Sequence, residues 1–289
     1  MTTTFSSRPA LFIIITLLAV HLAHAQMPAY TIFSSDGKTM DFKKMANAAR
    51  GAQVVLFGEH HDDPIAHWLQ LRLAKSLSEH KKLVIAAEML ETDNQQAVDR
   101  YLTGEYTAKQ LDSAARLWPN FKTDYKPIVD FAKEKKLRVI ASNVPRRYAS
   151  QVYKGGFEAL SALPDQEKSY MPPMPIAYDP NLPGYVRMMK EMGGHGGDNL
   201  PKAQALKDAT MAWSILRSLP QDGVLLHLNG TYHSDNHEGI GWYLRRENPR
   251  LKILTVATVS QDNVESLEAV HRGLADYIIV TPSDMTRTH

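Results

Sequence analysis

The residues most capable of chemistry in this sequence form one short run, Glu59, His60, His61, Asp62 and Asp63, which directly follows an apolar segment. Carboxylates and imidazoles ligate metals and transfer protons near neutral pH. Packing does not require five consecutive ionisable residues at the end of an apolar strand. The run therefore predicts a site and leaves the chemistry of that site open.

Polar side chains also end three later apolar segments, namely Glu88, Asn143, and Asn229 with His233. In parallel sheets the carboxyl ends of the strands lie at one edge, and ligands bind there, so we expect these side chains to converge. Turn preferences alone would explain an Asn at the end of a strand. They do not explain the Glu and His residues, which favour a shared site.

Two histidines and one carboxylate from these strand ends, His61, Glu88 and His233, would make a mixed nitrogen and oxygen ligand set for a divalent metal such as zinc or manganese. Such a metal would activate water for hydrolysis, with Glu59 as the candidate base, so these four residues are the candidate catalytic groups. Without a metal, the same side chains would form a hydrogen-bonded polar crevice. His67, inside the apolar pattern that follows, is either a core histidine or a further residue of the site.

An irregular segment at about 164–200 interrupts the regular pattern with many prolines and glycines and a short helix starting near Pro183. Long irregular insertions are typical of lids and binding loops. Its methionines recur at helical spacing, which is typical of core packing but also suits a flat apolar ligand such as haem, with Tyr or His as axial ligand and Arg pairing with a propionate. The candidate haem-binding residues are Tyr178, Tyr185, His195, Met188, Met192 and Arg187.

The elements that position these residues alternate between apolar β-branched segments and helical patterns. This alternation predicts an α/β fold, a mostly parallel β-sheet flanked by helices, with the irregular segment as a helical insertion and lid. Asp63 followed by Pro64 predicts the start of a helix. Strands are predicted at 54–57, 83–87, 138–142, 223–228, 253–259 and 277–280, and helices at 94–102, 108–117, 125–135, 146–163, 202–219 and 240–246.

Residues 1–25 have the pattern of an export signal, because Arg8 precedes a short apolar run and Ala23-His24-Ala25 is a small-residue cleavage pattern. A retained membrane anchor is the alternative, although the run is short for a bilayer. We expect cleavage near Ala25 and a single domain over 26–289 in the periplasm or outside the cell. With 0 Cys, the chain is not expected to be a lipoprotein or to hold disulfides.

Composition and the absence of several motifs argue against some classes of function. With 33 basic and 31 acidic residues, the chain lacks the excess of positive charge that is typical of nucleic-acid binding, so no nucleic-acid partner is expected. The sequence has no Gly-x-Ser-x-Gly elbow, no phosphate-binding Gly-x-x-x-x-Gly-Lys loop and no Gly-x-Gly-x-x-Gly turn. Serine hydrolases of the α/β type, ATPases and dinucleotide oxidoreductases therefore lose support.

Several blocks together resemble the ChaN-like haem-binding (lipo)protein family, within a wider superfamily of erythromycin esterase-like and Tiki-like proteins. These blocks are Gly58–Pro64 with His67 and Gln70, Ala87–Met89, Asn143–Arg146, Asp208–Ala212, and Asn229-Gly230 with His233. The resemblance implies an α/β fold, haem binding in bacterial iron uptake, and haem held between two subunits with tyrosine ligation. Two departures are the absence of Cys and the longer spacing from Asn229 to His233.

The leading hypothesis is a haem-binding protein of bacterial iron or haem acquisition rather than an enzyme. As partners we expect haem, a second copy of the chain in a homodimer that shares haem, and outer-membrane haem uptake machinery. The alternative hypothesis is a metal-dependent hydrolase that uses Glu59, His61, Glu88 and His233 at the strand ends.

Overall fold

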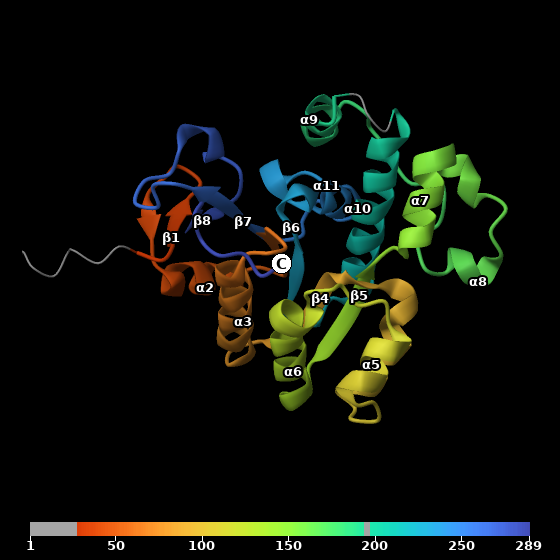
Figure 1. Cartoon of the computed structure of the whole chain (residues 1–289), viewed down its shortest axis with the longest axis horizontal. Coiled ribbons are helices and arrows are strands. Elements are labelled where there is room, and N and C mark those ends of the chain that lie inside the picture. Colours follow the sequence, from red (N-terminus) through yellow and green to blue (C-terminus); the bar gives the residue numbers. More distant parts are fainter. Residues whose placement is uncertain (1–27, 194–196) are drawn as a thin grey trace, which may run out of the picture.

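A computed structural model describes residues 28–193 and 197–289, which form one eight-stranded sheet in the order β2-β1-β8-β7-β3-β6-β4-β5 (Figure 1). The strands are β1 (Thr31–Ser34), β2 (Thr39–Met40), β3 (Val54–Glu59), β4 (Lys82–Glu91), β5 (Arg138–Asn143), β6 (Gly223–Gly230), β7 (Ile253–Gln261) and β8 (Tyr277–Pro282). Strands β3 to β8 pair in parallel, and β1 pairs antiparallel with β8 and β2. The predicted mostly parallel α/β fold is confirmed.

Helices cover both faces of the sheet. They are α2 (Phe42–Gly51), α3 (Pro64–Ser78), α4 (Gln95–Leu102), α5 (Ala108–Ala114), α6 (Lys126–Glu134), α7 (Arg146–Gly155), α8 (Asp165–Lys168), α9 (Pro183–Glu191), α10 (Asn199–Ser218) and α11 (Ile240–Glu247). One apolar core joins α2, α3 and α6 to the sheet, and a second joins α10 and α11 to its other face. Figure 1 shows these groups below and above the sheet, with α9 farther out.

Local chemistry explains why α3 begins where it does. The carboxylate of Asp63 accepts hydrogen bonds from the backbone amides of Ile65 and Ala66, each at 2.9 Å, and Pro64 occupies the first helical position. This cap satisfies amides that have no partner inside the helix. The predicted helix start is confirmed, and it ends the run of ionisable residues at a defined turn.

The structure differs from the predicted elements in three places. The strands β1 and β2 and the helix α2 precede the first predicted strand, because they are short or strongly amphipathic segments without a long apolar run. The helix predicted at 146–163 breaks at Gly156, which has a φ of 72°, and a 3₁₀ turn follows. The helix predicted at 108–117 ends at Ala114.

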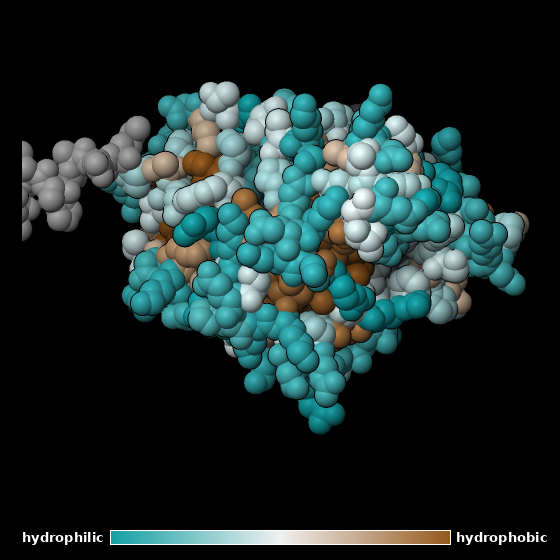
Figure 2. Space-filling view, turned by 90° about the horizontal axis from the view of Figure 1, so that it is seen from below, coloured by the Kyte–Doolittle hydropathy of each residue, from teal (hydrophilic) through white to brown (hydrophobic). Residues whose placement is uncertain are grey.

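The face seen from below is mostly hydrophilic, with apolar residues visible between the polar side chains of the covering helices (Figure 2). Within the described ranges, no helix is both long and apolar enough to cross a membrane. The expected signal segment, 1–25, lies outside the described residues.

Candidate functional site

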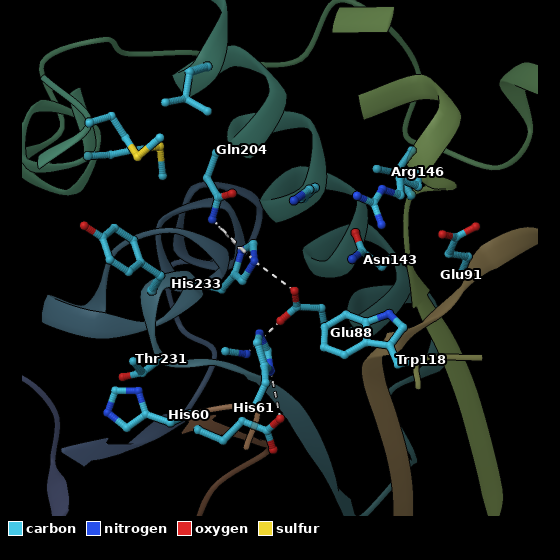
Figure 3. A pocket seen from close by; sticks show the side chains of 18 of the residues that line it. His60, His61, Glu88, Glu91, Trp118, Asn143, Arg146, Gln204, Thr231 and His233 are labelled. Carbon is cyan, nitrogen blue, oxygen red and sulfur yellow. Dashed lines mark hydrogen bonds and ion pairs between the residues drawn. The ribbon is translucent and has the colours of Figure 1, made fainter. Parts of the chain in front are cut away.

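A cavity of about 640 Å³ opens at the carboxyl ends of β3, β4, β5 and β6 (Figure 3). Its lining includes Glu59 and His61 from β3 and the loop after it, Glu88 from β4, Asn143 from β5, and His233 from the turn after β6. The structure thus brings together the strand-end residues that the sequence singles out. Parallel pairing places them at one edge, because Gly58 and Glu59 lie beside Asn229 and Gly230 in register.

Glu88 lies within β4 rather than after it. The pairing of β4 with β5 is regular as far as Ala87 and resumes at Glu91, so Glu88 occupies an irregular part of the strand. Bulges of this kind redirect side chains next to functional sites. The carboxylate of Glu88 accepts a hydrogen bond of 2.7 Å from the backbone amide of Gly230, which ties β4 to the end of β6.

His233 lies between two buried carboxylates. Its Nε2 is 3.1 Å from Glu88 Oε1, and its Nδ1 is 2.5 Å from Asp208 Oδ1 on α10. Burial alone would lower the pKa of His233, but Glu88 and Asp208 outweigh it and raise the pKa to about 10. His233 is therefore an imidazolium at neutral pH and holds two anions together.

The two carboxylates respond differently to this shared cation. Burial would raise the pKa of Glu88, but His233, then His61 and the amide of Gly230, hold it well below its usual value. Burial keeps the pKa of Asp208 above its usual value, despite the shorter contact to His233. We attribute the difference to the additional donors on Glu88, because the partners of Asp208 in the described part of the chain are the histidine and the hydroxyl of Tyr185 at 3.3 Å, and Asp208 is otherwise desolvated.

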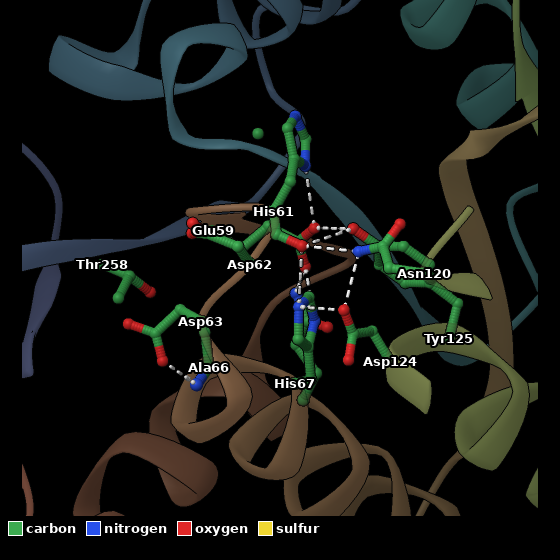
Figure 4. A network of polar contacts seen from close by, with 12 residues as sticks. Glu59, His61, Asp62, Asp63, Ala66, His67, Asn120, Asp124, Tyr125 and Thr258 are labelled. Atoms are coloured by element: carbon green, nitrogen blue, oxygen red, sulfur yellow. Dashed lines mark hydrogen bonds and ion pairs between the residues drawn. The ribbon is translucent and has the colours of Figure 1, made fainter. Parts of the chain in front are cut away.

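Glu59 is the centre of a second buried group (Figure 4). Its Oε1 accepts from the hydroxyl of Tyr125 at 2.6 Å and lies 3.0 Å from His61 Nδ1, and its Oε2 accepts from the amide nitrogen of Gln70 at 2.5 Å. His67 Nδ1 lies 3.3 Å from the same Oε2. Burial would raise the pKa of Glu59, but His61 and His67 lower it, so the carboxylate stays ionised. With its oxygens in contact with four side chains, Glu59 orients His61.

His61 is the most exposed member of this group in the cavity, with 37% of its side chain exposed. Burial would lower the pKa of His61, but the hydrogen bond with Glu59 and the charge of Glu88 raise it above its usual value. A Cβ atom on Gly230 would lie 2.8 Å from the His61 ring, so glycine at this position is what allows the imidazole to lie against the end of β6.

His67 belongs to the buried side of the site. Its Nε2 lies 3.2 Å from the carbonyl oxygen of His61 and 3.6 Å from Asp124 Oδ2. The amide nitrogen of Asn120 donates to the carbonyl oxygen of His61 at 2.7 Å and to Asp124 at 2.6 Å. This network fixes the backbone of the 59–63 run through the carbonyl oxygen of His61.

The expected metal centre finds no support in this geometry. Within 28–193 and 197–289, no group of three or more His, Asp or Glu side chains is arranged to hold a metal ion. The proposed ligands instead pair with one another: His233 with Glu88, and His61 with Glu59. The side chains thus form the hydrogen-bonded polar crevice that was the alternative.

The expected haem-binding residues are divided among several places. Met188 and Met192 line the strand-end cavity. Tyr185 is buried with its hydroxyl on Asp208, and Tyr178 packs against the Tyr185 ring and lines a separate hollow. The guanidinium of Arg187 lies 5.3 Å from the centre of the Tyr232 ring, beside the cavity. His195 lies outside the described residues.

The proline-rich part of the insertion does not cover the strand ends. Pro172, Pro173 and Pro175 line two other hollows together with Trp213 of α10. Only the later part, with α9, reaches the cavity, through Met188 and residues near the end of that helix.

Other residues in the cavity or directly behind its lining gave weak signals in the sequence or none. Asp208, which pairs with His233, was visible as a carboxylate within an apolar helix pattern and as part of a family block. Trp118, whose ring centre lies 4.7 Å from that of His61, and Tyr232 had no spacing signal. Tyr125 is a buried tyrosine that periodicity alone assigns to the core.

Comparisons with known proteins agree with this fold. The structure is similar to ChaN of Campylobacter jejuni, described as showing cofacial haem binding, with a TM-score of 0.65, 19% identity, and coverage of 87% of this chain and 96% of that one. It is also similar to a Bacillus cereus protein of known structure, with a TM-score of 0.50, 13% identity, and coverage of 83% and 91%. At such identities the likeness shows the fold alone.

A sequence relative is Protein RETICULATA-RELATED 5, chloroplastic, from Arabidopsis thaliana, 22% identical over 213 residues. The match covers 67% of this chain and 29% of that protein, so this chain spans less than a third of its relative. The family described as "Haem-binding uptake, Tiki superfamily, ChaN" matches residues 45–244, which include the strands β3 to β6 and every strand-end residue of the cavity. The chain belongs to this ChaN family of haem-binding proteins in the Tiki superfamily.

Proposed function

We propose that this protein binds haem in the strand-end cavity. The observation that carries the proposal is the combination, in one cavity, of apolar side chains that suit a porphyrin with an exposed tyrosine that suits its iron. Family membership supports haem as the ligand. Bound haem would supply an iron centre whose axial ligands come from the protein.

The cavity fits a group of this kind. Its volume of about 640 Å³ is within the roughly 300–1,000 Å³ typical of small-molecule sites. Trp118, Val144, Met188, Met192 and Leu200 supply aromatic and aliphatic surface around it. Thioethers and indole rings adapt to flat apolar ligands. The polar groups around Glu59 and Glu88 are paired with other protein groups, so they would keep these contacts when haem is bound.

Tyr232 is our choice of axial ligand. It lines the cavity and is 39% exposed, whereas Tyr185 is buried and Tyr178 lines another hollow. The hydroxyl of Tyr232 donates to the carboxylate of Glu191 on α9. This carboxylate can accept the proton that a phenol must lose to bind ferric iron as a phenolate.

His60 is a second group that can ligate iron. It lines the cavity, and within the described part of the chain its side chain forms no hydrogen bond or ion pair. Burial, then the charge of Arg287, lower the pKa of His60. The imidazole is therefore neutral at pH 7, which is the form that binds metal.

Titration with haemin tests the proposal. The wild-type protein should give a saturable, shifted Soret band at stoichiometric haemin, and Tyr232→Phe should weaken binding and change the charge-transfer bands of the ferric spectrum. Tyr153→Phe is the matched control, because Tyr153 is 44% exposed and lies on α7 outside the cavity. No spectral change in the wild-type protein would refute haem binding. An unchanged spectrum in Tyr232→Phe would refute the ligand assignment.

We further propose that two copies share haem in a homodimer and that the haem is destined for iron acquisition, through outer-membrane uptake machinery. Val186 on α9 and Met192, which directly follows α9 and lines the cavity, are exposed apolar side chains that suit a contact between copies. Light scattering with and without haemin would show a haem-dependent dimer. A deletion strain that grows normally on haem as sole iron source would contradict the role in acquisition.

We propose that the protein is exported, cleaved near Ala25 and periplasmic or secreted, and the signal pattern at 1–25 supports this proposal. Intact-mass measurement of protein recovered from the periplasmic fraction should give a chain beginning at Gln26. A full-length chain confined to the cytoplasmic fraction would contradict export.

A further inference from the structure

The carboxylates in the deep part of the cavity all have cationic partners. Glu88 pairs with His233 at 3.1 Å, and Glu91 Oε2 lies 2.7 Å from the guanidinium of Arg116. Glu59 is neutralised by its histidines in the same way. Ion pairing reduces the repulsion that these carboxylates exert on an anionic ligand, and His233 is shared between Glu88 and Asp208.

Two cations of the cavity have no such partner. Arg146 is the first residue of α7, and Lys207 lies on α10, which packs against α7. Both line the cavity, and neither forms a hydrogen bond or ion pair with any residue that the structure describes. Arg147, the next residue of α7, is paired with Asp93. Arg146 and Lys207 therefore give the cavity a positive charge that no described carboxylate offsets, whereas Asp93 offsets the charge of Arg147.

Asn143 adds an independent sign of a missing ligand. It lies at the end of β5, lines the cavity and is only 7% exposed. Its amide nitrogen makes no hydrogen bond among the described residues and is the donor that a carboxylate would meet, whereas its amide oxygen, which is buried without a hydrogen-bond partner, is an acceptor and needs a separate donor such as water. An unpaired buried amide costs roughly 1–3 kcal/mol, so such groups are normally satisfied by a ligand or by water.

The backbone at the start of α7 also favours an anion on this side of the cavity. Asn143 and Arg146 are separated by Val144 and by Pro145, the cap residue of α7, and no side chain caps this helix. Free amides and the helix dipole at an N-terminus favour an anion. In Figure 3, Arg146 and Asn143 lie together on the side of the cavity opposite His60 and Thr231.

We propose that Asn143, the N-terminus of α7, Arg146 and Lys207 form a carboxylate-binding subsite of the cavity. The inference rests on the proposed haem binding, and for haem the carboxylates are the propionates. Arg187, which was the expected partner of a propionate, stacks on Tyr232, so the propionates would bind on the other side of the cavity. The guanidinium and ammonium groups donate charge-assisted hydrogen bonds to the carboxylate, and the Asn143 amide nitrogen donates a further one.

Comparison of haemin with its dimethyl ester tests this subsite, because the ester keeps the iron and the ring but removes both carboxylate charges. The wild-type protein should bind haemin at least about tenfold more tightly than the ester, since tenfold corresponds to a single good charge-assisted contact. In the double variant Arg146→Gln/Lys207→Gln the preference should fall to about twofold. Lys154→Gln, which removes an exposed charge at the other end of α7, should keep the wild-type ratio.

Asn143→Asp gives a second, nearly isosteric test. A carboxylate at this position would repel a carboxylate ligand, so the variant should lose affinity for haemin but retain affinity for the ester. Far-ultraviolet circular dichroism and urea unfolding would verify that each variant is folded. Equal affinity of the wild-type protein for haemin and ester, or an unchanged ratio in the double variant, would overturn the subsite. If neither compound binds, the haem proposal itself fails.

Discussion

Replacement of His233 with Leu removes the one cation that lies between Glu88 and Asp208. In the wild-type protein its two ring nitrogens are 3.1 and 2.5 Å from these carboxylates, and all three side chains are buried. Leu is similar in size but has neither charge nor donor. The substitution therefore leaves two anions in a region of low dielectric constant without compensation.

The expected cost is about 3–5 kcal/mol in the free energy of unfolding at pH 7, the range for breaking a buried ion pair by removal of one partner. Urea unfolding followed by tryptophan fluorescence measures this loss. In the wild-type protein the pKa of His233 is raised from 6.5 to about 10. The contribution of His233 to stability is therefore complete below pH 6.5 and is lost as the pH rises through 10. The cost of the substitution should accordingly be larger at pH 6.5 than at pH 8.

A double-mutant cycle with Asp208→Asn separates charge from packing. In the wild-type background Asp208→Asn should destabilise the protein, because it weakens the contact with His233. In the His233→Leu background the same change should stabilise it, because it removes an unpaired buried charge. A loss below about 1 kcal/mol for His233→Leu, or the same sign for Asp208→Asn in both backgrounds, would refute the reasoning.

Three further predictions concern the supporting residues. Tyr125→Phe should reduce the free energy of unfolding by about 1.5–3 kcal/mol, because it removes a hydrogen bond to the ionised Glu59, whereas the exposed Tyr153→Phe should have little effect in the same urea experiment. Gly58→Ala should destabilise by about 1–3 kcal/mol, since its Cβ would lie 2.9 Å from a backbone carbon of the turn after β6; wild-type stability would contradict this. Burial lowers the pKa of His227 to about 4, so stability should fall by about 3 kcal/mol between pH 6.5 and 4, and NMR should show one imidazole that stays neutral at pH 5.

Much of the fold was predictable because its causes are local. The apolar β-branched segments predicted β3 to β8, and Asp63 with Pro64 predicted the start of α3. The strands β1 and β2 were not predictable in this way, because a strand of 4 and one of 2 residues carry too few apolar positions to show a period. The strand β1 is held by pairing with β8, which is a long-range contact, and β2 pairs in turn with β1.

Part of the site was predictable for a similar reason. Once parallel strands were expected, the polar residues at their ends had to lie at one edge, and the structure places His61, Glu88, Asn143 and His233 around one cavity. Their partners could not be predicted. Asp208 reaches His233 from a helix, and its role depends on how α10 packs against the sheet.

The sequence by itself determined the α/β fold, the edge of the sheet that carries the site and the family, because strand periodicity, caps and ordered motif blocks are properties of neighbouring residues. Only the tertiary structure decided what those residues do. It paired the expected metal ligands with one another, buried Tyr185 against Asp208, and placed Tyr232 at the cavity. It also left Arg146 and Lys207 without a partner among the residues that the structure describes. Pairing and burial depend on contacts between distant segments, which no local pattern in a single sequence specifies.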